Sequence, residues 1–101
     1  MIKGIGTDIV CVCRIDLKIA RNVLVGKEVE EYNNTNNKEQ YLASRFCVKE
    51  AIIKATNKQY QFKDIEILHN IDGSIKTNID GIYVSLSHEK EYCIAMCVWE
   101  D

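Results

Sequence analysis

The sequence predicts an α+β fold in which an antiparallel sheet packs with one long central helix. Residues 2–12 are apolar and rich in β-branched side chains, as strands are. Helical spacing follows, ending with a second, longer helix over residues 38–57. From Phe62 onward, apolar and polar side chains alternate in four short runs. One strand, two helices and then four strands in this order predict an antiparallel sheet with helices packed on it.

The composition is that of one small domain, and we expect it to span residues 1–101. Hydrophobic residues make up 47% of the chain and charged residues 28%, enough for a core and an ordinary surface. No apolar run approaches the ~18 residues of a membrane span. The start has no signal-peptide features, so a cytoplasmic protein is expected. The net charge of −2 argues against nucleic acid as a partner, because nucleic-acid binders carry a basic excess.

Asp8 stands out because it is a charged residue in the apolar amino-terminal strand. With a period of two it shares a strand face with Gly4 and Gly6, which permit another backbone to come close. A carboxylate on that face needs a partner. We therefore expect Asp8 to lie at a sheet edge or to serve as a ligand.

An apolar stripe predicts a helix from Arg14 to about Leu24, which Gly26 ends. The opposite face of this helix carries a basic stripe at positions i, i+4 and i+7, formed by Arg14, Lys18 and Arg21. Such a stripe is either a solvated surface or a docking surface for an acidic partner. The polar segment that follows, residues 27–37, predicts a short helical turn and then a loop.

The central helix places Glu50 and Lys54 one turn apart and therefore side by side. An acid beside a base on a helix is usually a surface ion pair worth about 0.3–0.5 kcal/mol. If Asp8 joined them from its strand, the carboxylate pair and the lysine would suit a hard divalent cation and a phosphate. Spacing alone does not bring Asp8 to Glu50.

Two features of the carboxyl-terminal half bear on turns and on phosphate binding. The tetrad Asn-Ile-Asp-Gly occurs at residues 70–73 and 78–81, and the first copy predicts a hairpin turn, since Asp-Gly tolerates positive φ. A later strand ends in Ser85-Leu86-Ser87-His88. His88 is either a surface residue or a phosphate contact, because Ser and His can both donate to phosphate oxygens.

Five cysteines, an odd number without a secretion signal, predict reduced thiols rather than a disulfide framework: Cys11, Cys13, Cys47, Cys93 and Cys97. Four of them could form a zinc site, but neither pair has the spacing of a zinc knuckle. Five core or semi-core thiols are the favoured interpretation, since free cysteine is among the most buried residue types.

Four motifs follow one another along the chain: Gly4–Val10 with Arg14-Ile15, Arg45–Ala51 with Lys54-Ala55, Phe62–Ile67, and Val84–Glu89 with Tyr92 and Ala95. Together they resemble the motifs of the holo-acyl-carrier-protein synthases, which are small 4′-phosphopantetheinyl transferases. The resemblance covers nearly the whole chain in order. It implies the 4′-phosphopantetheinyl transferase fold and the transfer of 4′-phosphopantetheine from coenzyme A to a serine of apo acyl carrier protein, leaving adenosine 3′,5′-bisphosphate.

The resemblance also implies the roles of single residues. Asp8 and Glu50 would hold Mg²⁺ with the pyrophosphate oxygens of the coenzyme, and Lys54 would neutralise phosphate charge. These three are the expected catalytic residues, and either Glu50 or a metal-bound water relayed to a carboxylate would take the serine proton. The residues that would contact the coenzyme are Arg45, Lys54, Ser87 and His88.

Partners are implied as well. The basic residues Arg14, Lys18 and Arg21 would dock an acidic helix of acyl carrier protein, in a homotrimer with sites between subunits that serves fatty acid biosynthesis and lipid metabolism. The family's glycine-rich loop after the central helix is missing from this chain. The alternative is therefore a non-catalytic descendant that binds carrier protein or nucleotide. The joint presence of the catalytic residues and His88 favours the enzyme.

Overall fold

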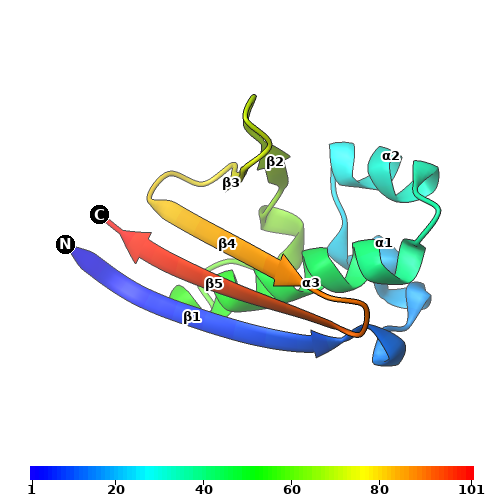
Figure 1. The fold of residues 1–101 in the computed structure, drawn as a ribbon. Helices are drawn as coiled ribbons and strands as arrows, with labels where there is room; N and C mark the ends of the chain where they lie inside the picture. The colour runs from blue at the N-terminus through cyan, green and yellow to red at the C-terminus, as the bar shows by residue number, and fades with distance from the viewer.

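A computed structural model describes residues 1–101 of the chain. Its main elements are β1 (Ile2–Cys11), α1 (Ala20–Val23), α2 (Lys27–Asn34), α3 (Lys38–Ala55), β2 (Ile67–His69), β3 (Ile75–Thr77), β4 (Ile82–His88) and β5 (Tyr92–Glu100). Three strands form an antiparallel sheet in the order β1-β5-β4, and α3 lies across one face of it (Figure 1). The predicted fold class, an α+β protein with an antiparallel sheet and one long helix, is confirmed. None of the helices is both long and apolar enough to cross a membrane.

Small residues on the inner face of the sheet let α3 lie close to it. A side chain at Gly4 or Gly6 would collide with the carbonyl oxygens of Ala55 and Ala51 on α3. Three inward-facing residues of the middle strand are also small and buried: Cys93, Ala95 and Cys97. The close approach predicted for the two glycines is therefore present, and it brings β1 against the carboxyl-terminal half of α3.

The central helix begins and ends near its predicted bounds. Asn37 caps its amino terminus, because the Asn37 side chain accepts a hydrogen bond of 3.1 Å from the backbone N–H of Gln40. The helix ends at Ala55, two residues before the predicted end. Asn57 and Lys58 then adopt positive φ angles of 51° and 66°, which a helix cannot continue through.

The prediction of one helix from Arg14 to Leu24 is wrong. The segment forms two separate 3₁₀ turns, Val12–Arg14 and Leu17–Ile19, and then the short helix α1. Ile15 between the turns is extended, with φ −72° and ψ 133°. Asp16 then starts the second turn, because its side chain accepts a hydrogen bond of 2.9 Å from the N–H of Lys18. The apolar spacing was right, but a local cap interrupts the helix.

The strand-rich half follows its predicted alternation but divides between two sheets. The first Asn-Ile-Asp-Gly tetrad closes the β2–β3 hairpin, with Gly73 at φ +90° and its N–H donating to the Asn70 carbonyl at 3.0 Å. In place of one antiparallel sheet, there are two: β4 and β5 join the amino-terminal strand, and β2 and β3 pair only with each other. The register pairs Asp8 with Ala95 across β1 and β5.

A buried ion pair fixes α3 against the segments before and after it. Lys49 and Glu28 are both fully buried, and the Lys49 Nζ lies 2.7 Å from Glu28 Oε1. The same Nζ donates to the carbonyls of Val23 at 2.6 Å and Phe62 at 3.3 Å. Glu28 in turn accepts from the N–H groups of Val25 and Ile67. Every donor of this lysine is used, so the pair ties α2, α3 and the start of β2 together.

The cysteines fall into two groups. Cys47, Cys93 and Cys97 are buried in the core between α3 and the sheet, as predicted. Cys11 is only half-buried and Cys13 is exposed, so the prediction of core or semi-core thiols is wrong for Cys13. All five are free.

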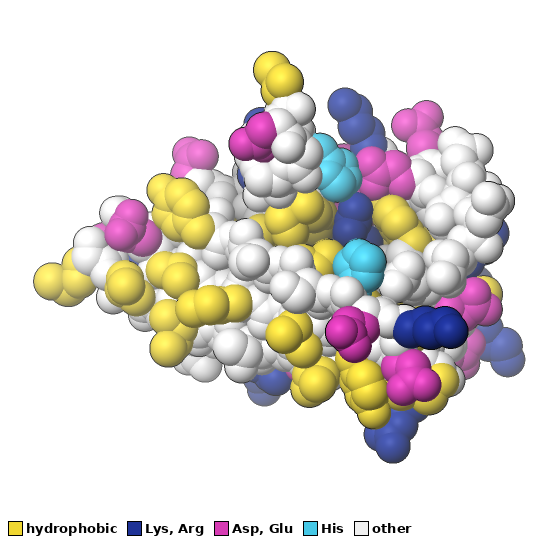
Figure 2. Space-filling model, viewed as in Figure 1, with side chains coloured by type: hydrophobic (Ala, Val, Ile, Leu, Met, Phe, Trp, Pro, Cys, Tyr) yellow, Lys and Arg dark blue, Asp and Glu magenta, His cyan; other side chains and the backbone are white.

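The outer face of the three-stranded sheet carries no helix and is apolar. Its exposed large side chains lie on all three strands, and Figure 2 shows hydrophobic side chains gathered over them. They include Ile5, Ile9, Tyr83, Ile94 and Met96, each at least half exposed. Isolated exposed apolar residues are ordinary, but a contiguous face of them marks an interaction surface.

Candidate active site

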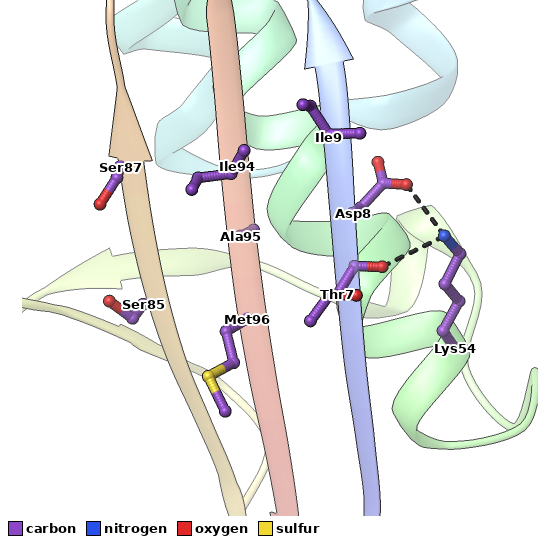
Figure 3. A pocket seen from close by; sticks show the side chains of 9 residues that line it. All are labelled: Thr7, Asp8, Ile9, Lys54, Ser85, Ser87, Ile94, Ala95 and Met96. Atoms are coloured by element: carbon purple, nitrogen blue, oxygen red, sulfur yellow. Dashed lines mark hydrogen bonds and ion pairs between the residues drawn. The ribbon is translucent and has the colours of Figure 1, made fainter.

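The predicted ion pair on the central helix forms with a different partner. Lys54 Nζ lies 3.0 Å from Asp8 Oδ1 and also donates to the Thr7 carbonyl at 3.1 Å (Figure 3). Asp8 points off the edge strand of the sheet toward α3, and its side chain is 15% exposed. Lys54 is 54% exposed, so its ammonium group is open to a ligand in solution. The approach of Asp8 to the helix, which spacing alone could not show, is present.

Glu50 completes a group of two carboxylates and one lysine. It lies one turn before Lys54 on α3 and is partly buried. Burial raises the pKa of the Glu50 carboxyl, and the nearby Asp8 charge raises it further, while Lys54 acts in the opposite direction. Glu50 lies beside Lys54 on the helix, and Lys54 is paired with Asp8, so the three charges form one group. The group therefore holds concentrated negative charge that a bound cation would relieve.

A shallow hollow extends from this group across the outer face of the sheet. Ser87 lines it from β4, on the far side of β5 from Asp8 (Figure 3). Its hydroxyl is exposed, and Ser85 lies beside it on the same face. Ser87 thus shares a hollow with Asp8 and Lys54, without contacting either in a single copy of the chain.

Arg45 lies in a second polar cluster that is separate from the carboxylates. Its guanidinium is 3.3 Å from His69 and 3.7 Å from Glu31, and it stacks 4.5 Å from the ring centre of Tyr41. Arg45 is buried, and its Nε has no hydrogen-bond partner. Sequence reasoning missed His69 and Glu31, because nothing in their spacing links a hairpin strand to α2.

His88 lies near the amino-terminal end of α3. Its Nδ1 is 3.2 Å from the amide of Gln40, and its side chain is exposed. Gln40 and Lys54 are about 21 Å apart along the helix, at 1.5 Å per residue. Figure 2 shows the two histidine side chains on one face of the molecule with a basic side chain between them. No contact joins His88 to the Asp8 group, but Leu86, two residues before His88 on β4, lies across β5 from Asp8.

The basic residues Arg14, Lys18 and Arg21 are all exposed, but they do not form one helix face. Arg14 borders a hollow with Ile15, Ile19 and Tyr92. Lys18 and Arg21 border another, with Leu17 and Tyr32. The break at Asp16 separates the first basic residue from the other two.

Comparison with protein families gives one match over nearly the whole chain. A family model described as the 4′-phosphopantetheinyl transferase superfamily matches residues 4–97. A holo-[acyl-carrier-protein] synthase from Thermodesulfovibrio yellowstonii is 40% identical, covering 97% of this chain and 98% of its own. One from Oceanobacillus iheyensis is 35% identical, covering 99% and 98%.

Solved structures agree with this fold. A holo-(acyl-carrier-protein) synthase from Bacillus anthracis, in complex with CoA (3′,5′-ADP), has a TM-score of 0.87 at 29% identity, covering all of this chain and 98% of its own. A holo-[acyl-carrier-protein] synthase from Neisseria meningitidis has a TM-score of 0.88 at 29% identity, and both chains are covered completely.

Proposed function

The chain belongs to the 4′-phosphopantetheinyl transferase superfamily, and we infer that it is a holo-acyl-carrier-protein synthase. It transfers 4′-phosphopantetheine from coenzyme A to a serine of apo acyl carrier protein and leaves adenosine 3′,5′-bisphosphate. The observation that carries the catalytic assignment is the meeting of Asp8 with Lys54, next to Glu50. These three side chains converge from the edge of a sheet and from one helix.

We propose that the reaction depends on Mg²⁺ held by Asp8 and Glu50. Two carboxylates from two elements suit this ion, which keeps several waters and is usually completed by substrate phosphates. Burial and then the nearby Asp8 charge raise the pKa of Glu50, and a bound cation would relieve the repulsion between the two carboxylates. When bound, the ion would neutralise the pyrophosphate of the coenzyme.

The remaining steps are neutralisation of phosphate charge and removal of the serine proton. Lys54 lies on the exposed side of Asp8, where its ammonium group can contact a phosphate as a point charge. The serine oxygen attacks the phosphorus next to the pantetheine arm, and the bond from that phosphorus to the oxygen of the leaving adenosine 3′,5′-bisphosphate breaks. Either Glu50 or a metal-bound water relayed to a carboxylate would accept the serine proton.

We propose that the coenzyme also contacts Arg45, Ser87 and His88. Arg45 and His88 would bind the nucleotide end, since guanidinium and imidazole groups donate well to phosphate. Because Arg45 is buried against Glu31 and His69, it would act with its network rather than as a free side chain. Ser87 would contact the coenzyme from the hollow that it shares with Asp8.

The acyl carrier protein is the macromolecular substrate, and we propose that it docks on the exposed basic residues Arg14, Lys18 and Arg21. The broken helix gives this surface two parts, one at the end of β1 and one at α1. An acidic helix of the carrier could contact both. We further propose that the product serves fatty acid biosynthesis in the cytoplasm, where five free thiols stay reduced.

We propose that the active form is a homotrimer with sites between subunits. The apolar outer face of the sheet would be covered in such an assembly. Size-exclusion chromatography with light scattering tests it: the mass of three copies is expected, and Ile9→Lys should lower it. A wild-type monomer that is fully active would contradict the trimer.

Mass spectrometry of apo acyl carrier protein tests the transfer directly. With this protein, coenzyme A and Mg²⁺, the carrier should gain one phosphopantetheine group. Asp8→Asn and Glu50→Gln should each abolish the gain, whereas the exposed controls Asp80→Asn and Glu39→Gln should retain it. Removing Mg²⁺ with EDTA should stop the reaction, and adding it back should restore it. No gain with several carriers, combined with measurable carrier binding, would instead favour the non-catalytic binding module.

A further inference from the structure

Cys11 and Cys13 bring their sulfur atoms together at the end of β1. The two Sγ atoms lie 2.8 Å apart. Cys11 ends the strand, and the chain then enters the 3₁₀ turn Val12–Arg14, which swings Cys13 back toward it. The turn is held on both sides, since Val12 donates to the Glu91 carbonyl at 2.7 Å and Ile15 donates to the Val12 carbonyl at 3.2 Å. A disulfide has a sulfur–sulfur distance of about 2.05 Å, so only a small movement separates the dithiol from it.

The environment of this pair differs from that of the other cysteines. Cys13 is exposed and Cys11 is half-buried, so a small molecule can reach them. The other three thiols lie in the core, where burial raises the pKa of Cys47 to about 12 and that of Cys97 to about 11, and also raises that of Cys93. Because the thiolate is the reactive form, the core thiols are protected twice, by access and by protonation.

We propose that Cys11 and Cys13 form a modification site for low-molecular-weight disulfides, in which one cysteine attacks and the other resolves the mixed disulfide. The hydrogen bond between the two sulfur atoms and the charge of Arg14 lower the pKa of Cys11. The site is independent of the transferase chemistry and needs no residue of the Asp8 group.

The exchange balances with the disulfide as the only oxidant. The thiolate of one cysteine attacks one sulfur of the small disulfide, forming a mixed disulfide and releasing one thiolate. The other cysteine then loses its proton and attacks the sulfur of the first, which expels the second small thiol. The two cysteines are oxidised to one disulfide, and the small disulfide is reduced to two thiols.

Peptide mapping of the intact protein after incubation with oxidised glutathione tests the site. Trypsin cleaves after Lys3 and Arg14, so residues 4–14 form one peptide that contains both cysteines of the pair and no other. This peptide should lose two hydrogen atoms and resist alkylation, and dithiothreitol should reverse the change. The peptides with Cys47, Cys93 and Cys97 should stay reduced until the protein is unfolded.

Single substitutions test the pairing of the two cysteines. Cys13→Ser should trap glutathione on Cys11, and Cys11→Ser should trap it on Cys13. A mixed disulfide with glutathione that persists in the wild-type protein would overturn the resolving step. A peptide 4–14 that remains fully reduced while glutathione modifies the core cysteines, or no cysteine, would overturn the site itself. Neither result depends on transferase activity, so the two proposals stand or fall separately.

Discussion

The helix α3 carries two lysines, five residues apart, that each pair with a carboxylate from another element. The two pairs have different roles. Lys49 with Glu28 is completely buried at 2.7 Å, while Lys54 with Asp8 is 3.0 Å apart and its lysine is 54% exposed. Five residues turn the helix by about 140°, so one lysine faces α2 and the other faces β1. The chemistry of the two pairs is the same. Burial decides that one fixes the fold and the other can meet a substrate.

The hydrogen bonds around each pair explain this difference in role. The buried Lys49 uses all its donors on protein acceptors, and Glu28 accepts two backbone N–H groups as well. Nothing is left for a ligand. Lys54 has two protein acceptors on β1 and keeps an open side. A charge that is fully satisfied stabilises structure, and one that is partly satisfied can act in catalysis.

The largest expected effect comes from breaking the buried pair. Lys49→Met leaves Glu28 buried and uncompensated, so the free energy of unfolding should fall by about 3–5 kcal/mol. Urea unfolding followed by circular dichroism measures the change. The double variant Lys49→Met with Glu28→Leu should recover only part of the loss, because no unpaired charge remains but the N–H groups of Val25 and Ile67 lose their acceptor. A single variant within about 0.5 kcal/mol of wild type, where ordinary surface substitutions fall, would show that the pair does not fix the fold.

Replacing the lysine of the exposed pair by methionine should lower activity and leave stability almost unchanged. Lys54→Met removes a cation from the developing phosphate charge, so kcat should fall by about 10²-fold, as for loss of one stabilising group elsewhere. The free energy of unfolding should change by no more than about 1 kcal/mol, since exposed ion pairs contribute little. Steady-state transfer kinetics and urea unfolding on the same preparation separate the two effects. A large stability loss with unchanged kcat would erase the distinction between the pairs.

Gly6 is expected to affect both stability and activity. A methyl group there meets the Ala51 carbonyl, so Gly6→Ala should push β1 away from α3 and cost about 1–3 kcal/mol, as overpacking does. Because Asp8 is two residues along the same strand, transfer activity per folded molecule should also drop. Thr7→Ala on the exposed outer face is the stability control and should stay within about 0.5 kcal/mol of wild type. Full activity in Gly6→Ala would mean that the close approach does not position Asp8.

The sequence pattern predicted what depends on local spacing. The strand of Asp8, the helix of Glu50 and Lys54, and the turn at Asn70–Gly73 were all expected and are all present. What it missed depends on contacts between distant segments. The buried role of Lys49 was missed, because its partner Glu28 lies on another helix. The break at Asp16 was missed for a local reason, since a single side-chain cap outweighed a good apolar stripe.

The resemblance to a family supplied the step that spacing could not. From periodicity alone, Asp8 and Glu50 were two acids on separate elements, and their proximity depends on two glycines and a row of small residues on β5. Such proximity is a property of packing. Pairwise spacing in the sequence does not encode it.

The smallest expected effect tests whether exposed basic residues act on the carrier protein alone. Arg14→Glu with Arg21→Glu should raise the KM for acyl carrier protein by about fivefold to tenfold, equivalent to about 1 kcal/mol, and should leave the KM for coenzyme A unchanged. The wild-type KM for the carrier should rise with added salt, because exposed charges are screened, and the double variant should lose that dependence. Lys76→Glu, an exposed charge reversal on β3, is the matched control.

The single variants give a sharper test, because the helix is interrupted and Arg14 and Arg21 border different hollows. If both single variants contribute, the carrier contacts both sides of the break; if only Arg21→Glu has an effect, the docking surface is confined to α1 and the turn before it. Equal increases in both KM values would place these charges in the coenzyme site and contradict a docking role.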